Sequence, residues 1–130
     1  MLKITYLESE LRLEHLSISV EAWLARRSYL AARSGGTLIL RPSYASLLLF
    51  QDLPRLPRFL EELGRMAVDV DICDRTHLEI TLYGTWVSEH AASDSGVFLT
   101  SLPHPTEQQL LHFWQLSQAG VSVGSAQASI

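Results

Sequence analysis

The sequence predicts an α+β domain, a mainly antiparallel β-sheet with about three helices packed on one face. Strand-like segments follow one another more often than they alternate with helices, which argues against a parallel, doubly wound sheet. Hydrophobic residues make up 47% and charged residues 18% of the 130 positions, as in folded domains. A chain of this length is expected to fold around a single hydrophobic core. We therefore expect residues 1–120 to form a single domain and the small, polar segment 121–130 to be a flexible tail.

The chain is expected to open with a β-hairpin. Residues 2–7 and 10–16 alternate between apolar and polar side chains. A two-residue loop between them would pair Leu7 with Glu10. That register places Ile4 opposite a second apolar residue, so one face of the hairpin can be buried.

Three segments are predicted to be helices, because their apolar residues recur at spacings of three and four. They are residues 19–33, a segment from Pro54 or Pro57 to about Arg65, and a segment from His104 to about Ala119. Ser17 or Ser19 would cap the first helix.

The remaining apolar segments are expected to be strands. Thr37–Leu40 is a short apolar strand that Pro42 should end, because proline is rare inside sheets. Residues 43–50 are ambiguous between a helical turn and a buried strand. Further strands are expected at about 67–73, 77–87 and 97–100.

The densest group of chemically reactive side chains lies at residues 68–79, V-D-V-D-I-C-D-R-T-H-L-E. Strand alternation places Asp69 and Asp71 on the face opposite the valines. If residues 74–76 form a three-residue loop, Asp71 lies opposite Glu79. Such a loop would require Thr76 or a neighbour to adopt a conformation that glycine prefers.

Facing like charges destabilise a sheet, so we expect Asp71 and Glu79 to be neutralised. One interpretation is a divalent-metal site with ligands from Asp69, Asp71 and Glu79, joined by His77. The other is a solvated sheet face on which water screens the charges, which is common for exposed strands. Because nine of the ten basic residues are arginines, we expect a guanidinium near the pair before a metal. No other cofactor is expected.

A second candidate surface is a basic stripe on the first predicted helix. Arg26, Tyr29 and Arg33 recur at spacings of three and four and therefore share one side of the helix. This side could bind an anion, a phosphate group or an acidic protein surface. The alternative is an ordinary solvated helix face.

Two further combinations have the residue types of a catalytic site. Cys73 and His77 could form a thiolate–imidazole pair. The segment 90–95 contains histidine, serines and an aspartate, as hydrolase triads do. A triad is assembled from separate rigid elements, however, and we interpret this segment as a loop.

Charge and composition restrict the class of partner and the compartment. The net charge is −4, with +2 on residues 1–65 and −6 on residues 66–130. This acidity argues against nucleic acid as a partner. The opposite charges of the two halves of the chain suit association between two copies. No apolar stretch is long enough to span a membrane, and the N-terminus lacks the features of a signal peptide. With one cysteine, Cys73, a cytoplasmic location is expected.

Three segments resemble a group of small uncharacterised cyanobacterial proteins. They are T-L-Y-G-T-W-V-S at 81–88, G-V-F-L-T at 96–100 and L-L-H-F-W-Q-L-S-Q-A at 110–119. The resemblance implies a cytoplasmic bacterial protein and identifies no site residue.

Together these observations predict a non-enzymatic protein–protein interaction or regulatory domain that forms a homodimer. The basic stripe would meet an acidic surface, such as the 69/71/79 face of the same or a second chain. Trp23, Trp86 and Trp114 are candidate interface anchors. The alternative is a small divalent-metal- or ligand-binding protein, or an enzyme, centred on the acidic hairpin at residues 69–79.

Overall fold

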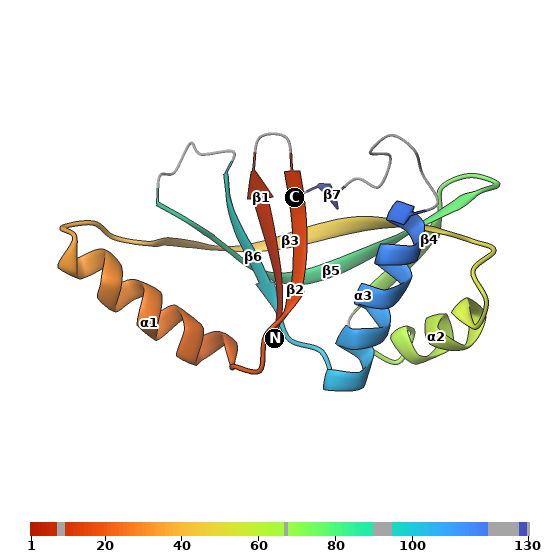
Figure 1. Ribbon diagram of the computed structural model, residues 1–130, viewed down its shortest axis with the longest axis horizontal. Helices are drawn as coiled ribbons and strands as arrows, with labels where there is room; N and C mark the ends of the chain where they lie inside the picture. The colour runs from red at the N-terminus through yellow and green to blue at the C-terminus, as the bar shows by residue number, and fades with distance from the viewer. Residues whose placement is uncertain (8–9, 67, 90–94, 120–127, 130) are drawn as a thin grey trace.

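The computed structural model describes residues 1–7, 10–66, 68–89, 95–119 and 128–129 (Figure 1). The strands are β1 (Leu2–Leu7), β2 (Glu10–His15), β3 (Ile39–Phe50), β4 (Val68–Ile72), β5 (His77–Ser88), β6 (Gly96–Thr100) and β7 (Ala128–Ser129). The helices are α1 (Val20–Arg33), α2 (Leu56–Leu63) and α3 (His104–Ala119).

All strands pair antiparallel in one sheet, in the order β2-β1-β6-β5-β3-β7, with β4 also on β5. Strand β3 occupies one edge of β5 over its whole length, so β4 and β6 share the other edge. The long β3–β5 pair runs across the molecule, with α1 at one end and α2 and α3 towards the other (Figure 1). The predicted α+β class is confirmed.

Both predicted hairpin registers are confirmed. Leu7 pairs with Glu10 in the first hairpin, and Ile4 lies opposite Leu13. In the second hairpin Asp71 lies opposite Glu79. Strict alternation determines these registers, because a shift by one residue would expose every apolar side chain of the strand.

The expectation that Pro42 ends a strand is wrong. The chain stays extended from Ile39 to Phe50, which also shows that the ambiguous segment 43–50 is a strand. Pro42 pairs with Thr85 of β5 on one side. In the described chain, the other edge of β3 is paired only at 46–47, by β7. Proline is tolerated there because an open edge needs no N–H donor.

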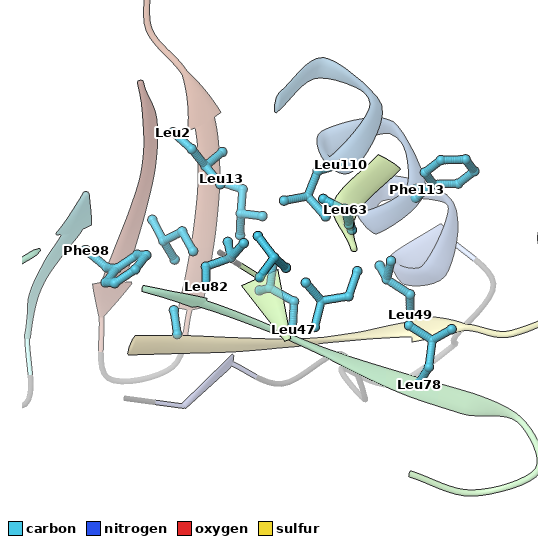
Figure 2. Close-up of a cluster of buried hydrophobic side chains, with 14 of the residues drawn as sticks. Leu2, Leu13, Leu47, Leu49, Leu63, Leu78, Leu82, Phe98, Leu110 and Phe113 are labelled. Carbon is cyan, nitrogen blue, oxygen red and sulfur yellow. The ribbon is translucent and has the colours of Figure 1, made fainter. Parts of the chain in front are cut away.

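The main core lies between the sheet and helices α2 and α3 (Figure 2). Its fully buried side chains include Leu47 of β3, Leu63 of α2 and Leu110 of α3. A smaller cluster around Val87 and Leu99 contacts α1. These two residues directly follow the main-core residues Trp86 and Phe98, so α1 packs on the opposite side-chain face of β5 and β6. The expectation that the helices pack on one face of the sheet is therefore wrong for α1.

Most of the expected tail, residues 121–127 and 130, lies outside the described residues. Ala128 and Ser129 form the short strand β7 against Leu47 and Ser46 of β3. No helix in the described part of the chain is long and apolar enough to cross a membrane.

Candidate protein interface

Helix α1 is poorly covered by the other residues that the structure describes. It has 14 residues, begins after Ser19, whose hydroxyl caps Ala22 N–H, and contains no buried residue. Val20, Trp23 and Leu24 are half-buried against the small cluster. Beyond them the helix is exposed apart from a half-buried alanine, and Leu30 keeps 54% of its surface exposed. Helices this short are marginal in water without tertiary packing.

A groove separates α1 from the strands beneath it. Two adjoining hollows of about 330 and 270 Å³ share the residues Arg27, Leu38 and Glu89. The first hollow is also lined by Leu30 and the second by Trp23. Beyond its packed first turn and a half, the inner side of α1 therefore faces a partly apolar groove instead of a core.

The basic stripe lies on an exposed side of α1. The Arg33 guanidinium lies 5.8 Å from the centre of the Tyr29 ring, and its Nη1 donates to the Tyr29 hydroxyl at 3.4 Å. Tyr29 is 62% exposed, and Arg26 is exposed as well. Arg27 differs, because its guanidinium lies 5.4 Å from the Trp23 ring, at the groove. The stripe is thus an arginine–tyrosine surface open to solvent.

The predicted acidic residues lie together on the other side-chain face of the β4–β5 hairpin from the main core. Asp69 and Asp71 are exposed and Glu79 is half-buried. We call these three residues the acidic sheet face. The Tyr83 hydroxyl donates to Asp69, and this hydrogen bond raises the pKa of Tyr83.

The guanidinium expected near Asp71 and Glu79 does not come from the described part of the same chain. No described residue forms an ion pair with either carboxylate. Tyr44 and Tyr83, paired across β3 and β5 on the same face, are both exposed beside them. The facing carboxylates are left to solvent or to another chain.

Within the ranges that the structure describes, no three histidine, cysteine, aspartate or glutamate residues could hold a metal ion. His77, the expected fourth ligand, is engaged elsewhere. Its Nδ1 lies 2.7 Å from Thr76 Oγ1, and its ring packs 4.9 Å from that of Phe50.

Cys73 is an exposed free cysteine. Desolvation and the carboxylates of Glu79, Asp74 and Asp71 raise the pKa of its thiol. A raised pKa disfavours the thiolate that a nucleophile requires. The contact to His77 runs through the backbone, from Cys73 N–H to the His77 carbonyl at 3.2 Å.

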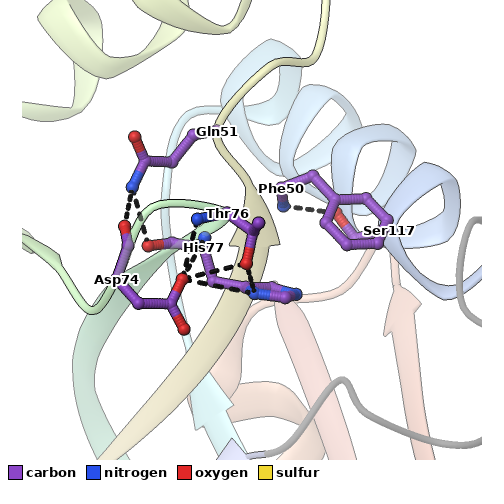
Figure 3. A network of polar contacts seen from close by, with 6 residues as sticks. All are labelled: Phe50, Gln51, Asp74, Thr76, His77 and Ser117. Atoms are coloured by element: carbon purple, nitrogen blue, oxygen red, sulfur yellow. Dashed lines mark hydrogen bonds and ion pairs between the residues drawn. The ribbon is translucent and has the colours of Figure 1, made fainter.

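Asp74 closes the loop between β4 and β5, where a glycine-like backbone conformation was expected (Figure 3). Its Oδ1 accepts from the N–H groups of Thr76 and His77, each at 2.8 Å, and from Thr76 Oγ1 at 2.9 Å. Among the described residues other than glycine, Arg55 alone has a positive φ, so this part of the prediction is wrong. The carboxylate organises the loop instead.

These hydrogen bonds lower the pKa of Asp74, which predicts a pH dependence. Between the folded pKa and the unfolded value near 3.9, the unfolded state binds more protons. The contribution of Asp74 is therefore complete above about pH 4 and is lost as the pH falls through the folded pKa. Asp74→Ala should lower the melting temperature at pH 7, and its difference from wild type should shrink below pH 4.

Thermal denaturation between pH 2 and 7 checks this expectation. Asp52→Ala, at an exposed carboxylate in the turn after β3, is the matched control and should show no such trend. A difference between Asp74→Ala and wild type that stays constant with pH would contradict the role of the charge.

A buried polar cluster lies at the start of α3. Glu107 is only 1% exposed, and its Oε2 lies 2.5 Å from His15 Nδ1 and 3.6 Å from the Met1 ammonium. Its Oε1 accepts from Leu102 N–H at 3.0 Å. The His104 ring packs on that of His15 at 4.3 Å. The cluster joins the ends of β1 and β2 to α3.

No pattern in the sequence predicts this cluster. A glutamate in the first turn of a helix ordinarily favours the helix dipole at the surface and gives no sign of burial. A carboxylate–imidazole pair can act as a general base, but His15 Nε2 is buried and has no hydrogen-bond partner. His15, His104 and Glu107 line an open hollow of about 280 Å³, but the imidazole nitrogen that would take up a proton from a substrate is buried, so we interpret the cluster as structural.

The remaining predicted candidates are not brought together. Residues 90–94 of the triad-like segment lie outside the described residues. Trp86 is buried in the main core and cannot anchor an interface, whereas Trp114 is half-buried beside that core and Trp23 lines the α1 groove.

The fold and surfaces define a small α+β domain with a weakly covered basic helix at one end and an acidic sheet face towards the other. The chain belongs to the Alr0857-like family, whose model matches residues 1–118. The prefix Alr marks genes of Nostoc and Anabaena, so the resemblance to small cyanobacterial proteins is confirmed. No curated protein and no solved structure matches the chain.

Proposed function

We propose that this protein is a non-enzymatic interaction domain that acts as a homodimer, in which α1 of each copy docks on the acidic sheet face of the other. The observation that carries the proposal is the exposure of α1, since this 14-residue helix has no buried residue and contacts the core of the described chain mainly through half-buried side chains near its start. A partner that covers Leu30 and Tyr29 would supply the missing packing.

Charge identifies the partner surface. Residues 20–33 carry three arginines against one glutamate, whereas residues 68–83 carry four acidic residues against one arginine. A guanidinium from a second copy would neutralise the facing Asp71 and Glu79. Tyr44 and Tyr83 beside them offer aromatic faces on which arginine can stack.

Symmetry allows both contacts to form at once. Helix α1 and the β4–β5 hairpin lie towards opposite ends of the molecule (Figure 1). In an antiparallel pair related by a two-fold axis, each basic helix reaches the acidic face of the other copy, and the assembly closes as a dimer. The exposed free Cys73 supports a reducing, cytoplasmic location for this dimer.

Charge reversal on α1 tests the proposal. We expect wild type to be a dimer in low salt and the double variant Arg26→Glu/Arg33→Glu to associate at least about 100-fold more weakly, because facing like charges cost several kcal/mol. Sedimentation equilibrium measures both. Arg41→Glu/Arg65→Glu makes the same change in charge at exposed positions outside α1 and should leave the dimer intact.

A compensating variant distinguishes direct pairing between α1 and the acidic sheet face from a general effect of net charge on association. Adding Asp71→Arg/Glu79→Arg to the α1 double variant should restore association, since both partners are then reversed. A monomeric wild type at about 100 μM, far above the dissociation constants of specific dimers, would refute the proposal. Dimerisation that is insensitive to the α1 reversal would also refute it.

A further inference from the structure

A second surface of the molecule is a cleft between α2 and α3, separate from the proposed dimer contacts. Its volume is about 600 Å³, within the range of small-molecule sites. The floor is formed by the buried rings of Phe59 and Phe113, whose centres lie 5.0 Å apart. The rim is polar and consists of Arg55, Arg58, Gln108, Gln109 and His112 with Pro54 and Glu62.

The two arginines on this rim are not neutralised by the described part of their own chain. Arg55 and Arg58 are exposed, and neither guanidinium group forms a hydrogen bond or ion pair with any residue that the structure describes. Glu62 lies one helical turn after Arg58 without bridging to it. The rim thus carries positive charge beside an apolar floor.

The backbone at Arg55 adds an independent observation. Arg55 occupies the N-cap position of α2 with φ 68° and ψ 0°, and its side chain makes no capping hydrogen bond. Helices prefer serine, threonine, aspartate or asparagine there, and a positive φ is unfavourable for arginine. The Arg55 carbonyl accepts from Phe59 N–H at 3.3 Å, as any residue's carbonyl could, so the arginine side chain adds nothing to the helix start. Strained residues of this kind concentrate at ligand sites.

We propose that the cleft binds a small organic anion, with its carboxylate or phosphate group on Arg55 and Arg58 and its apolar body against the parts of Phe59 and Phe113 that line the cleft. Guanidinium groups bind either anion through paired N–H donors. The amides of Gln108 and Gln109 can hydrogen-bond further polar atoms of the ligand. This inference does not depend on the dimer, whose contacts lie on α1 and the acidic sheet face.

Titration of two probes, phenyl phosphate and benzoate, into the full chain tests the proposal by NMR. We expect the tighter probe to bind with a dissociation constant on the order of 1 mM, as ligands of this size do, and to shift the amides of Phe59, Gln108 and Phe113. The better probe identifies the anion class. Benzyl alcohol, which has the ring without the charge, should bind at least tenfold more weakly, and so should inorganic phosphate.

Substitution of the arginines provides the control. Arg55→Ala/Arg58→Ala should weaken binding at least tenfold, whereas Arg65→Ala, at an exposed arginine after α2, should not change it. Both sites are on the surface, and the NMR spectrum shows whether each variant is folded. The proposal is overturned if neither anion shifts cleft resonances at about 10 mM, ten times the expected dissociation constant. Equal binding by the double variant, or inorganic phosphate binding as tightly as the aromatic probes, would also overturn it.

Discussion

Replacing Glu107 with glutamine is expected to lower the free energy of unfolding by about 3 kcal/mol and the melting temperature by about 10 °C. The substitution keeps the shape of a side chain that is 1% exposed and removes its charge. It leaves His15, whose side chain is 13% exposed, without its carboxylate partner. Removing one member of a largely buried pair destabilises a protein by more than the intact pair stabilises it. Chemical denaturation monitored by circular dichroism measures the change.

Two comparisons isolate this effect. Glu61→Gln makes the same chemical change at an exposed position on α2 and should alter stability by less than about 0.5 kcal/mol. A double-mutant cycle with His15→Asn should give a coupling energy of about 1 kcal/mol or more, because the two side chains are in contact. Additive effects of Glu107→Gln and His15→Asn would show that the pair is not coupled.

The hairpins could be predicted from the sequence because each register depends on residues close together in the chain. Alternation over β1 and β2, or β4 and β5, leaves one pairing that buries all the apolar side chains. The behaviour of Pro42 depends instead on which edge of β3 lies open, a property of strand order. The β4–β5 loop forms without glycine because the Asp74 carboxylate accepts hydrogen bonds from the backbone N–H groups of Thr76 and His77. These hydrogen bonds stabilise the turn in place of a positive-φ residue.

The candidate surfaces likewise divide into those that follow from local sequence patterns and those that depend on long-range packing. The Arg26–Tyr29–Arg33 stripe follows from helical periodicity, so the sequence could predict that these residues share a side. The exposure of α1 could not be predicted, because it depends on how far the sheet extends beneath the helix. The pair His15–Glu107 joins positions 92 residues apart, and the α2–α3 cleft likewise depends on helix packing. Such contacts leave no local pattern.

Gly84 is the position where one edge of β5 changes neighbours. Strand β4 ends its pairing at Leu82, and β6 begins its pairing with Leu99 opposite Thr85. A Cβ at Gly84 would lie 2.1 Å from the Leu99 carbonyl oxygen and 3.0 Å from the Phe98 ring. The close approach of two backbones therefore requires glycine at this position, whatever its backbone conformation.

Gly84→Ala is consequently expected to destabilise the protein by about 3 kcal/mol or more, at the upper end for overpacked sites, because β6 must move away from β5. This movement would also disrupt the packing of Trp86 on β5 and Phe98 on β6 in the main core. Gly64→Ala is the matched control, since a Cβ there meets only ordinary contacts at 3.5 Å in a helical backbone. Urea denaturation should leave Gly64→Ala close to wild type. A similar stability for Gly84→Ala would mean that the two strands lie further apart than described.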